Sequence, residues 1–288
     1  MQHTVNNLIN VIADPKLKAQ ILALSQAYQQ VENKPFSIGI MGKSGSGKSS
    51  FVNVLCQKDV CRTSGVGGCT REVQQIAAKL GEMDIRLYDF PGIAENSQWN
   101  QAYWNLYIPY LREMDMIFWL IKVDDRAVVE DEKFYKKCIE NDRELSDKFI
   151  IILSQADKAE PNREWDHEAF KPSFAQEKTL LKNKQRIYAD FIDSTTPLTS
   201  TPSSIKMKRV ITIAIDFIKN RGKLKIYGFN GIFDILVLTL FNISGIKDKL
   251  PSTIYKEIAQ KRNELTKNES LSSVFRSVRS LSSLFGRY

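Results

Sequence analysis

Residues 36–50 read FSIGIMGKSGSGKSS, and this stretch decides the fold of the 288-residue chain. The apolar run at 36–41 predicts a short buried strand, and the residues after it fit the pattern G-x-x-x-x-G-K-S. A helix-like run, SSFVNVLCQ, follows at once. Glycines let the backbone approach an anion closely, and the N–H groups at a helix start solvate its charge. The stretch therefore predicts a strand, a phosphate-binding loop and a helix in immediate succession.

The loop suggests a role for its polar side chains. Lys48 would reach the β- and γ-phosphates of a nucleoside triphosphate, and the Ser49 hydroxyl would bind Mg²⁺. The candidate nucleotide-binding residues of the loop are Gly42, Ser44, Gly45, Ser46, Gly47, Lys48, Ser49 and Ser50.

A second motif, YDFPG at 88–92, ends a predicted strand some way along the chain. Asp89 is placed to hold Mg²⁺ through a water, and the Gly92 N–H is placed to contact the γ-phosphate. Behind a phosphate-binding loop this spacing indicates a nucleotide-hydrolysing site, with Lys48 and Gly92 among the candidate catalytic residues.

A third stretch, FIIILSQADK at 149–158, predicts a buried strand that delivers polar side chains to its carboxyl end. The Asp157 carboxylate can accept from guanine N1–H and N2–H₂ together, whereas adenine offers no N1 donor. A guanine-reading loop would normally be written Asn-Lys-x-Asp, so Ser154 and Gln155 depart from the pattern. We interpret the stretch as a loosened guanine pocket with weaker bracing, with Gln155, Asp157 and Lys158 as candidate ligands.

Strands alternate with helices along the chain, which indicates an α/β fold with three layers around a mostly parallel sheet. Further strands are expected at Gln75–Leu80, Ile85–Phe90, Met116–Val123 and Phe149–Ser154. Helices are expected at Trp99–Glu113, Val129–Asn141, Glu164–Ile192 and Ser204–Lys219. The short connection GEMD at 81–84 suits a hairpin, so one antiparallel edge strand is also expected.

At this point the chain resembles the Era-like, translation-factor-related P-loop GTPases of the TRAFAC class. In particular, FWLIKVDDRAVVEDEKFYKKCI (118–139) followed by SQADK is similar to the prophage- and island-encoded bacterial 50S ribosome-binding GTPases. The loop GKSGSGKSS also resembles those of septins and immunity-related GTPases. The resemblance covers residues 34–220. It divides the chain into an N-terminal helical segment (1–33), a GTPase domain (34–220) and a basic helical C-terminal region (221–288).

The resemblance implies binding of GTP and GDP with Mg²⁺, and hydrolysis of GTP. Thr70, in the loop GVGGCTRE, would be the switch I threonine, a metal ligand and a catalytic residue; Asp89–Gly92 would open switch II. Ser200, within TST at 199–201, would be a counterpart of the last guanine loop. An ordinary Ser/Thr/Pro linker is the alternative at that place.

Ile93 stands where many signalling GTPases have a water-orienting glutamine, so slow intrinsic turnover is expected. One alternative route uses a potassium ion bound by a P-loop asparagine, but the matching position here is Gly45. Lys43, Ser44 or a residue from a second molecule remain as candidates. Two hypotheses stand for the whole protein: a GTPase switch, and a non-catalytic GTP-binding assembly module that dimerises across its nucleotide face.

The net charge of +8 is unevenly distributed: residues 206–288 sum to +10 and residues 1–205 to −2. Three interpretations of the C-terminal region compete. It would bind ribosomal or other RNA, or lie on a membrane surface through the apolar stripe of residues 271–285. In the third, the helix expected at 226–246 packs on the GTPase domain or on the N-terminal helices.

The remaining features predict a cytoplasmic protein, with peripheral membrane association as the alternative. The four cysteines are too few and too irregularly spaced for a disulfide framework. No basic segment followed by an apolar core opens the chain, so no signal peptide is expected. No stretch reaches the ~18 uninterrupted apolar residues of a spanning helix.

Overall fold

The fold is given by a computed structural model, which describes residues 7–61, 73–92, 101–125, 128–193, 209–218 and 223–264. Within them, a six-stranded sheet has the order β2-β3-β1-β4-β5-β6. Its strands are β1 (Phe36–Gly42), β2 (Gln74–Leu80), β3 (Met83–Asp89), β4 (Met116–Lys122), β5 (Phe149–Ser154) and β6 (Val210–Thr212). The four strands expected here after β1 each lie within two residues of the predicted bounds.

The sheet is mostly parallel. β1 pairs in parallel with β3 and β4, β4 with β5, and β5 with β6. β2 runs antiparallel to β3 across the turn that follows Leu80. The structure confirms the expected α/β fold with one antiparallel edge strand, and it brings the carboxyl ends of β1, β3, β4 and β5 to one edge.

Alternate residues of the central strands face opposite layers, because side chains of a strand point to alternate faces. On β4, Phe118 and Leu120 join the core on one face, and Ile117 and Trp119 join the core on the other. Both sets are buried, which explains why β4 and β5 read as nearly continuous apolar runs.

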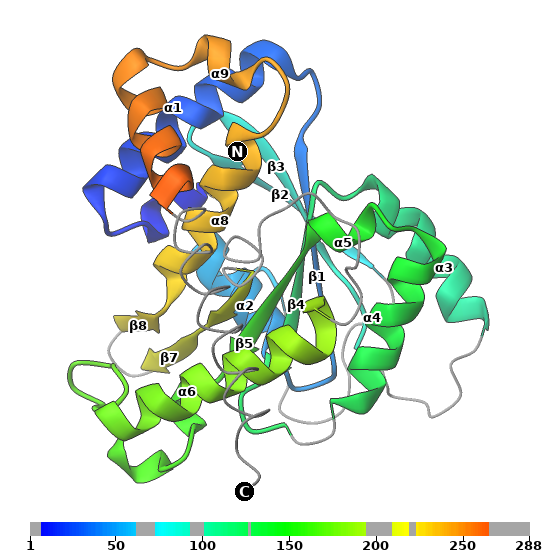
Figure 1. Cartoon of the computed structure of the whole chain (residues 1–288), viewed down its shortest axis with the longest axis vertical. Helices are drawn as coiled ribbons and strands as arrows, with labels where there is room; N and C mark the ends of the chain where they lie inside the picture. The colour runs from blue at the N-terminus through cyan, green and yellow to red at the C-terminus, as the bar shows by residue number, and fades with distance from the viewer. Residues whose placement is uncertain are drawn as a thin grey trace, which may run out of the picture.

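Helices cover both faces of the sheet and give three layers (Figure 1). One face carries α3 (Gln101–Glu113), α4 (Val129–Asn141), the short α5 (Leu145–Lys148) and the end of α6 (Phe174–Ile187). The other carries α1 (Pro15–Val31), α2 (Lys48–Cys56), α8 (Phe229–Phe241) and the short α9 (Ile246–Lys249). Residues 252–264 are also helical.

The two ends of the described chain meet on one face of the sheet. A 3₁₀ turn (Leu8–Val11) precedes α1, which begins at Pro15. Asp14 caps this helix, because its side chain accepts hydrogen bonds from the Lys16 and Leu17 N–H groups. α8, whose sequence is almost wholly apolar, lies beside α1 and is buried against the same core (Figure 1). The helix expected near 226–246 therefore packs against α1 and the core on this face of the sheet, as the third interpretation proposes.

Two expected helices are wrong in part. Where a helix was expected over 204–219, residues 210–212 form β6, and Ala214–Ile218 forms β7, which pairs antiparallel with β8 (Lys223–Tyr227). The β-branched residues of VITIAI favour a strand, and β6 completes the parallel sheet. The helix expected from 164 begins only at Phe174, after Pro172 and a capping box at Ser173, and it continues as a π-helix over Tyr188–Asp193.

The division at residue 220 stays a prediction, and the β7–β8 hairpin has one strand on each side of it. Within the described residues, no helix is long and apolar enough to cross a membrane. The apolar stripe of residues 271–285 lies outside the described part of the chain.

Candidate functional site

The phosphate-loop residues form the turn from β1 into α2. Gly42, Gly45 and Gly47 have positive φ angles of 139°, 73° and 94°. A Cβ on Gly42 would lie 2.3 Å from the Leu120 carbonyl oxygen of β4, so only glycine fits there. The loop is therefore pressed against the end of the neighbouring strand.

Lys48, the first residue of α2, turns back over this loop. Its side chain is 8% exposed, and Nζ donates to the carbonyl oxygens of Gly42 (2.8 Å) and Lys43 (2.9 Å). These bonds hold the ammonium against the phosphate loop, next to the N-terminus of α2. Both features favour an anion, as the sequence predicts.

Asp89 and Ser49, which the sequence predicts to be metal ligands, lie together beside Lys48. Asp89 ends β3 and is 0% exposed, and its Oδ2 lies 3.5 Å from the Ser49 Oγ. Asp89 Oδ1 has no hydrogen-bond partner among the described residues. Burial raises the pKa of Asp89, and the charge of Lys48 opposes that rise. The Ser49 hydroxyl and the Asp89 carboxylate, one oxygen of which is buried and unsatisfied, fit Mg²⁺, which takes hard oxygen ligands and retains waters.

Gly92 lies directly against the phosphate loop. A Cβ at this position would lie 3.0 Å from the backbone nitrogen of Ser44 and 3.3 Å from its Cα. The preceding Pro91 carbonyl accepts from the Tyr107 hydroxyl at 3.0 Å. The strand end that carries Asp89 is therefore held next to the loop, where the sequence predicts contact with a γ-phosphate.

The loop 154–158, which the sequence predicts to read the base (the base-reading loop), is bonded to the phosphate loop by the two residues that depart from the usual pattern. Ser154 Oγ donates to the Ser46 carbonyl oxygen at 2.7 Å, and Gln155 Nε2 donates to the Gly45 carbonyl oxygen at 3.1 Å. Lys158 Nζ donates to Gln155 Oε1 at 2.6 Å, which holds that side chain in place. Ser154 and Gln155 thus join the two loops directly, although the sequence suggested weaker bracing.

Asp157 lies in the 3₁₀ turn Ala156–Lys158 and is half-buried. Burial raises the pKa of its carboxyl group, against the charges of Lys158 and His167, while Asp216 raises it further. A partly desolvated carboxylate gains from a ligand that brings two donors together, as the guanine edge does.

The segment after β6 adjoins the predicted base site, and the sequence did not indicate this neighbour. The Ala156 N–H donates to the Ile213 carbonyl oxygen at 2.9 Å, which joins the base-reading loop to the residues that follow β6. Asp216, on β7, is close enough to affect the Asp157 pKa. The signal for β6 was the β-branched run VITI. Ser200, expected in this role, lies outside the described residues.

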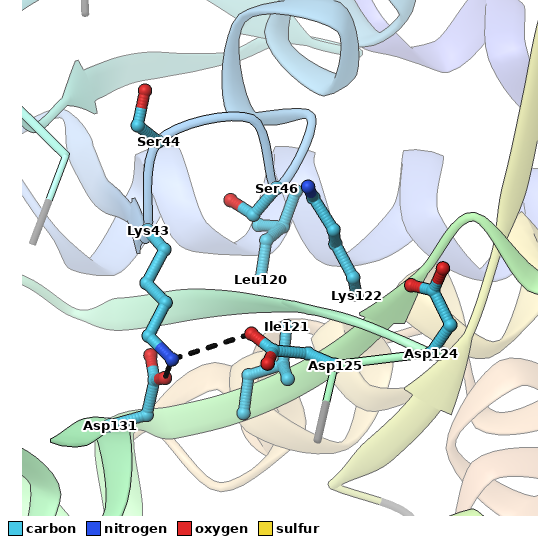
Figure 2. Close-up of a pocket in the computed structure, with 9 residues that line it drawn as sticks. All are labelled: Lys43, Ser44, Ser46, Leu120, Ile121, Lys122, Asp124, Asp125 and Asp131. Atoms are coloured by element: carbon cyan, nitrogen blue, oxygen red, sulfur yellow. Dashed lines mark hydrogen bonds and ion pairs between the residues drawn. The ribbon is translucent and has the colours of Figure 1, made fainter. Parts of the chain in front are cut away.

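A cavity of about 430 Å³ opens beside the phosphate loop (Figure 2). It is lined by Lys43, Ser44, Ser46, Leu120, Ile121, Lys122, Asp124, Asp125 and Asp131. Lys43 Nζ lies 2.7 Å from Asp131 Oδ2 and 3.3 Å from Asp125 Oδ2. Asp131 is 1% exposed and also accepts from Trp119 Nε1 at 3.1 Å. The Lys43 side chain therefore ties the phosphate loop to α4.

The structure gathers most of the predicted site residues at one edge of the sheet. The phosphate loop, Asp89 and Gly92, and the loop 154–158 follow the carboxyl ends of β1, β3 and β5. Thr70 and Ile93, like Ser200, lie outside the described residues, and their roles stay predictions.

Comparison with known sequences agrees with this geometry. Residues 37–155 match the family model of the 50S ribosome-binding GTPase. The Escherichia coli (strain K12) proteins YkfA and YfjP are each 41% identical over 138 residues, which are 48% of this chain and 47% of theirs. The tRNA modification GTPase MnmE of Campylobacter jejuni (strain RM1221) is 28% identical over 69% of this chain and 45% of its own length. The chain spans about half the length of the curated relatives it matches.

Comparison with solved structures shows the fold. The structure of Toc33 from Arabidopsis thaliana in complex with Mg²⁺ and GMPPNP has a TM-score of 0.58 at 17% identity. The match covers 82% of this chain and 97% of that one. The fold is thus that of the P-loop GTPases, and the family match supports GTP binding. The narrower resemblance to Era-like and prophage-encoded proteins stays a prediction.

Proposed function

We propose that this protein binds GTP with Mg²⁺, hydrolyses it to GDP and phosphate, and acts as a nucleotide-controlled switch. The observation that carries the proposal is the direct bonding of the base-reading loop to the phosphate loop through Ser154 and Gln155. Because these bonds fix the two loops relative to each other, one nucleotide can meet the Lys48 ammonium and the Asp157 carboxylate together. GTP carries a triphosphate that can meet the ammonium of Lys48 and a guanine edge that can meet the carboxylate of Asp157.

Hydrolysis at this site would depend on positioning and charge neutralisation, which are the main needs of phosphoryl transfer. Lys48 stabilises the negative charge of the β- and γ-phosphates, and the Gly92 N–H is placed to donate to the γ-phosphate. Ser49, Asp89 and, in the proposal, Thr70 would hold Mg²⁺. When bound, that ion supplies further positive charge at the phosphates.

The guanine assignment is tested by replacing Asp157 with asparagine. The new amide presents a donor to guanine's own donors, so we expect Asp157→Asn to weaken binding of GTP and GDP by about 10- to 100-fold. Binding of ATP, which gains nothing from the carboxylate, should stay weak in both proteins. Calorimetric titration with the three nucleotides measures these changes.

A suitable control is Asp84→Asn, because Asp84 is an exposed carboxylate in an ion pair with Lys79. It lies near the start of β3, whereas the site lies at the other end of the strand. The control should bind GTP like the wild type. Unchanged GTP affinity in Asp157→Asn would show that the base site has been assigned wrongly.

A second proposal concerns turnover and self-association. Ile93 has no polar group with which to orient water, so we expect slow intrinsic hydrolysis that accelerates when a second copy completes the site. Among the solved structures with this fold, dimerization is important for the GTPase activity of the chloroplast translocon components atToc33 and psToc159. Specific activity should rise with protein concentration, together with a nucleotide-dependent increase in mass. Equal specific activity across a wide dilution series would contradict this proposal.

Single-turnover hydrolysis separates the switch from the non-catalytic assembly module, since the module would pair on binding GTP and leave it intact. Contact of residues 221–288 with RNA, the ribosome or a membrane surface is a further proposal. It rests on the positive charge of that region and on the match of residues 37–155 to the 50S ribosome-binding GTPase family.

A further inference from the structure

Lys122 brings a second ammonium group to the phosphate loop. It is the last residue of β4, and an added Cβ on Gly45 would lie 3.4 Å from its Nζ and 3.7 Å from its Cε. Figure 2 shows the side chain reaching from β4 toward the loop beside Ser46. Gly45 also occupies the position that matches the potassium-binding P-loop asparagine considered in the sequence analysis.

The position of Lys122 is set by the sheet. Lys122 pairs with Ser154 across β4 and β5, and Ser154 Oγ bonds to the Ser46 carbonyl oxygen of the phosphate loop at 2.7 Å. Ser154 therefore holds both the end of β4, which carries Lys122, and the phosphate loop. Because the backbone is fixed, only the side-chain torsions of Lys122 remain to be ordered when it meets a ligand.

The ammonium group of Lys122 has different neighbours from the ammonium groups of the other two lysines at this loop. Lys48 donates to backbone carbonyls, and Lys43 lies in ion pairs with Asp125 and Asp131. Lys122 forms no ion pair with any residue in the described part of the chain, although carboxylates line the same cavity. Lys122 is a half-buried residue, and an ammonium without a carboxylate partner in such a place is stabilised by an anionic ligand.

We propose that Lys122 is a second phosphate-binding lysine, which contacts the polyphosphate of the bound nucleotide from the Gly45 side of the loop. The proposal rests on the proposed GTP binding. Its ammonium supplies there the single positive charge that a bound potassium ion would otherwise provide. Turnover should therefore be the same in sodium and potassium salts.

The test compares Lys122→Met, Lys122→Arg and the control Lys79→Met, which removes a strand lysine paired with Asp84 on β3. Calorimetric titration with GTP, and separately with inorganic tripolyphosphate, is run in Mg²⁺ at low and high salt. Lys122→Met should lose about 10- to 100-fold in affinity for both ligands, with a shallower salt dependence. Lys122→Arg should recover most of the loss, and the control should match the wild type.

The two ligands keep the two proposals separable. If the wild type binds tripolyphosphate through Lys122 but does not prefer GTP to ATP, the guanine assignment fails and this inference stands. If Lys122→Met binds both ligands like the wild type, or if turnover by the wild type requires potassium, the inference is overturned. Lys122→Gln is a second uncharged variant in case the methionine variant does not fold. Wild-type protein that binds neither ligand overturns both proposals.

Discussion

Lys48→Met is expected to weaken GTP binding by at least about 100-fold and to abolish measurable hydrolysis. Lys48 is 8% exposed, and its ammonium donates to the Gly42 and Lys43 carbonyl oxygens of the phosphate loop. Methionine has a similar length and no charge, so the phosphates would lose their central cation while the packing of α2 is retained. Calorimetry with GTP and single-turnover hydrolysis measure the two effects.

Lys48→Met must be compared with a folded reference, because its two bonds to the loop are lost as well. Its circular dichroism spectrum and unfolding midpoint should stay close to those of the wild type and of Lys79→Met. A folded Lys48→Met protein that binds GTP within threefold of the wild type would contradict the phosphate site. That outcome would leave only the fold assignment standing.

Phe233→Ala is expected to lower the free energy of unfolding by about 3–5 kcal/mol, as for other buried aromatic truncations. Phe233 is 1% exposed on α8 and belongs to the core that also holds α1, α2 and the strands β1 and β4. The loss of its ring leaves a cavity in that core, so the whole domain should be destabilised. Urea denaturation followed by circular dichroism measures the change.

Phe174→Ala is the matched control, because it removes the same side chain from a position that is 72% exposed at the start of α6. We expect it to cost about 1 kcal/mol or less. If Phe233→Ala costs no more than Phe174→Ala, α8 is an attached element rather than part of the core. A large difference would show that residues beyond the predicted boundary at 220 complete the GTPase fold.

The secondary structure was predictable where local preferences and tertiary packing agree. The apolar runs at β4 and β5 were correctly predicted as buried strands, and their predicted bounds differ from the structure by at most one residue. The run VITIAIDFI was misread because a short apolar segment suits either a helix or a strand. The run forms two strands because β6 pairs with β5 and β7 pairs with β8, and these pairings are tertiary contacts that the run itself does not report.

The candidate site was predictable from the sequence where its residues belong to short motifs, and not where it depends on long-range contacts. Gly42, Lys48, Ser49 and Asp89 belong to short motifs in which each residue has a role set by phosphate or metal chemistry. By contrast, the sequence predicted weaker bracing of the guanine loop, because Ser154 and Gln155 replace the usual Asn and Lys. Their bonds to Ser46 and Gly45 join residues 108 and 110 positions apart, and no local pattern reports such a contact.

The sequence by itself determined the strand–loop–helix unit at 36–56, because glycine supplies positive φ and apolar periodicity selects strand or helix within a few residues. Only the tertiary structure decided that Lys122 lies over Gly45, that Lys43 is tied to Asp131, and that α8 lies beside α1. The reason is physical: strand order and parallel pairing bring distant chain segments to one edge of the sheet. The positions of their side chains relative to one another depend on that whole arrangement.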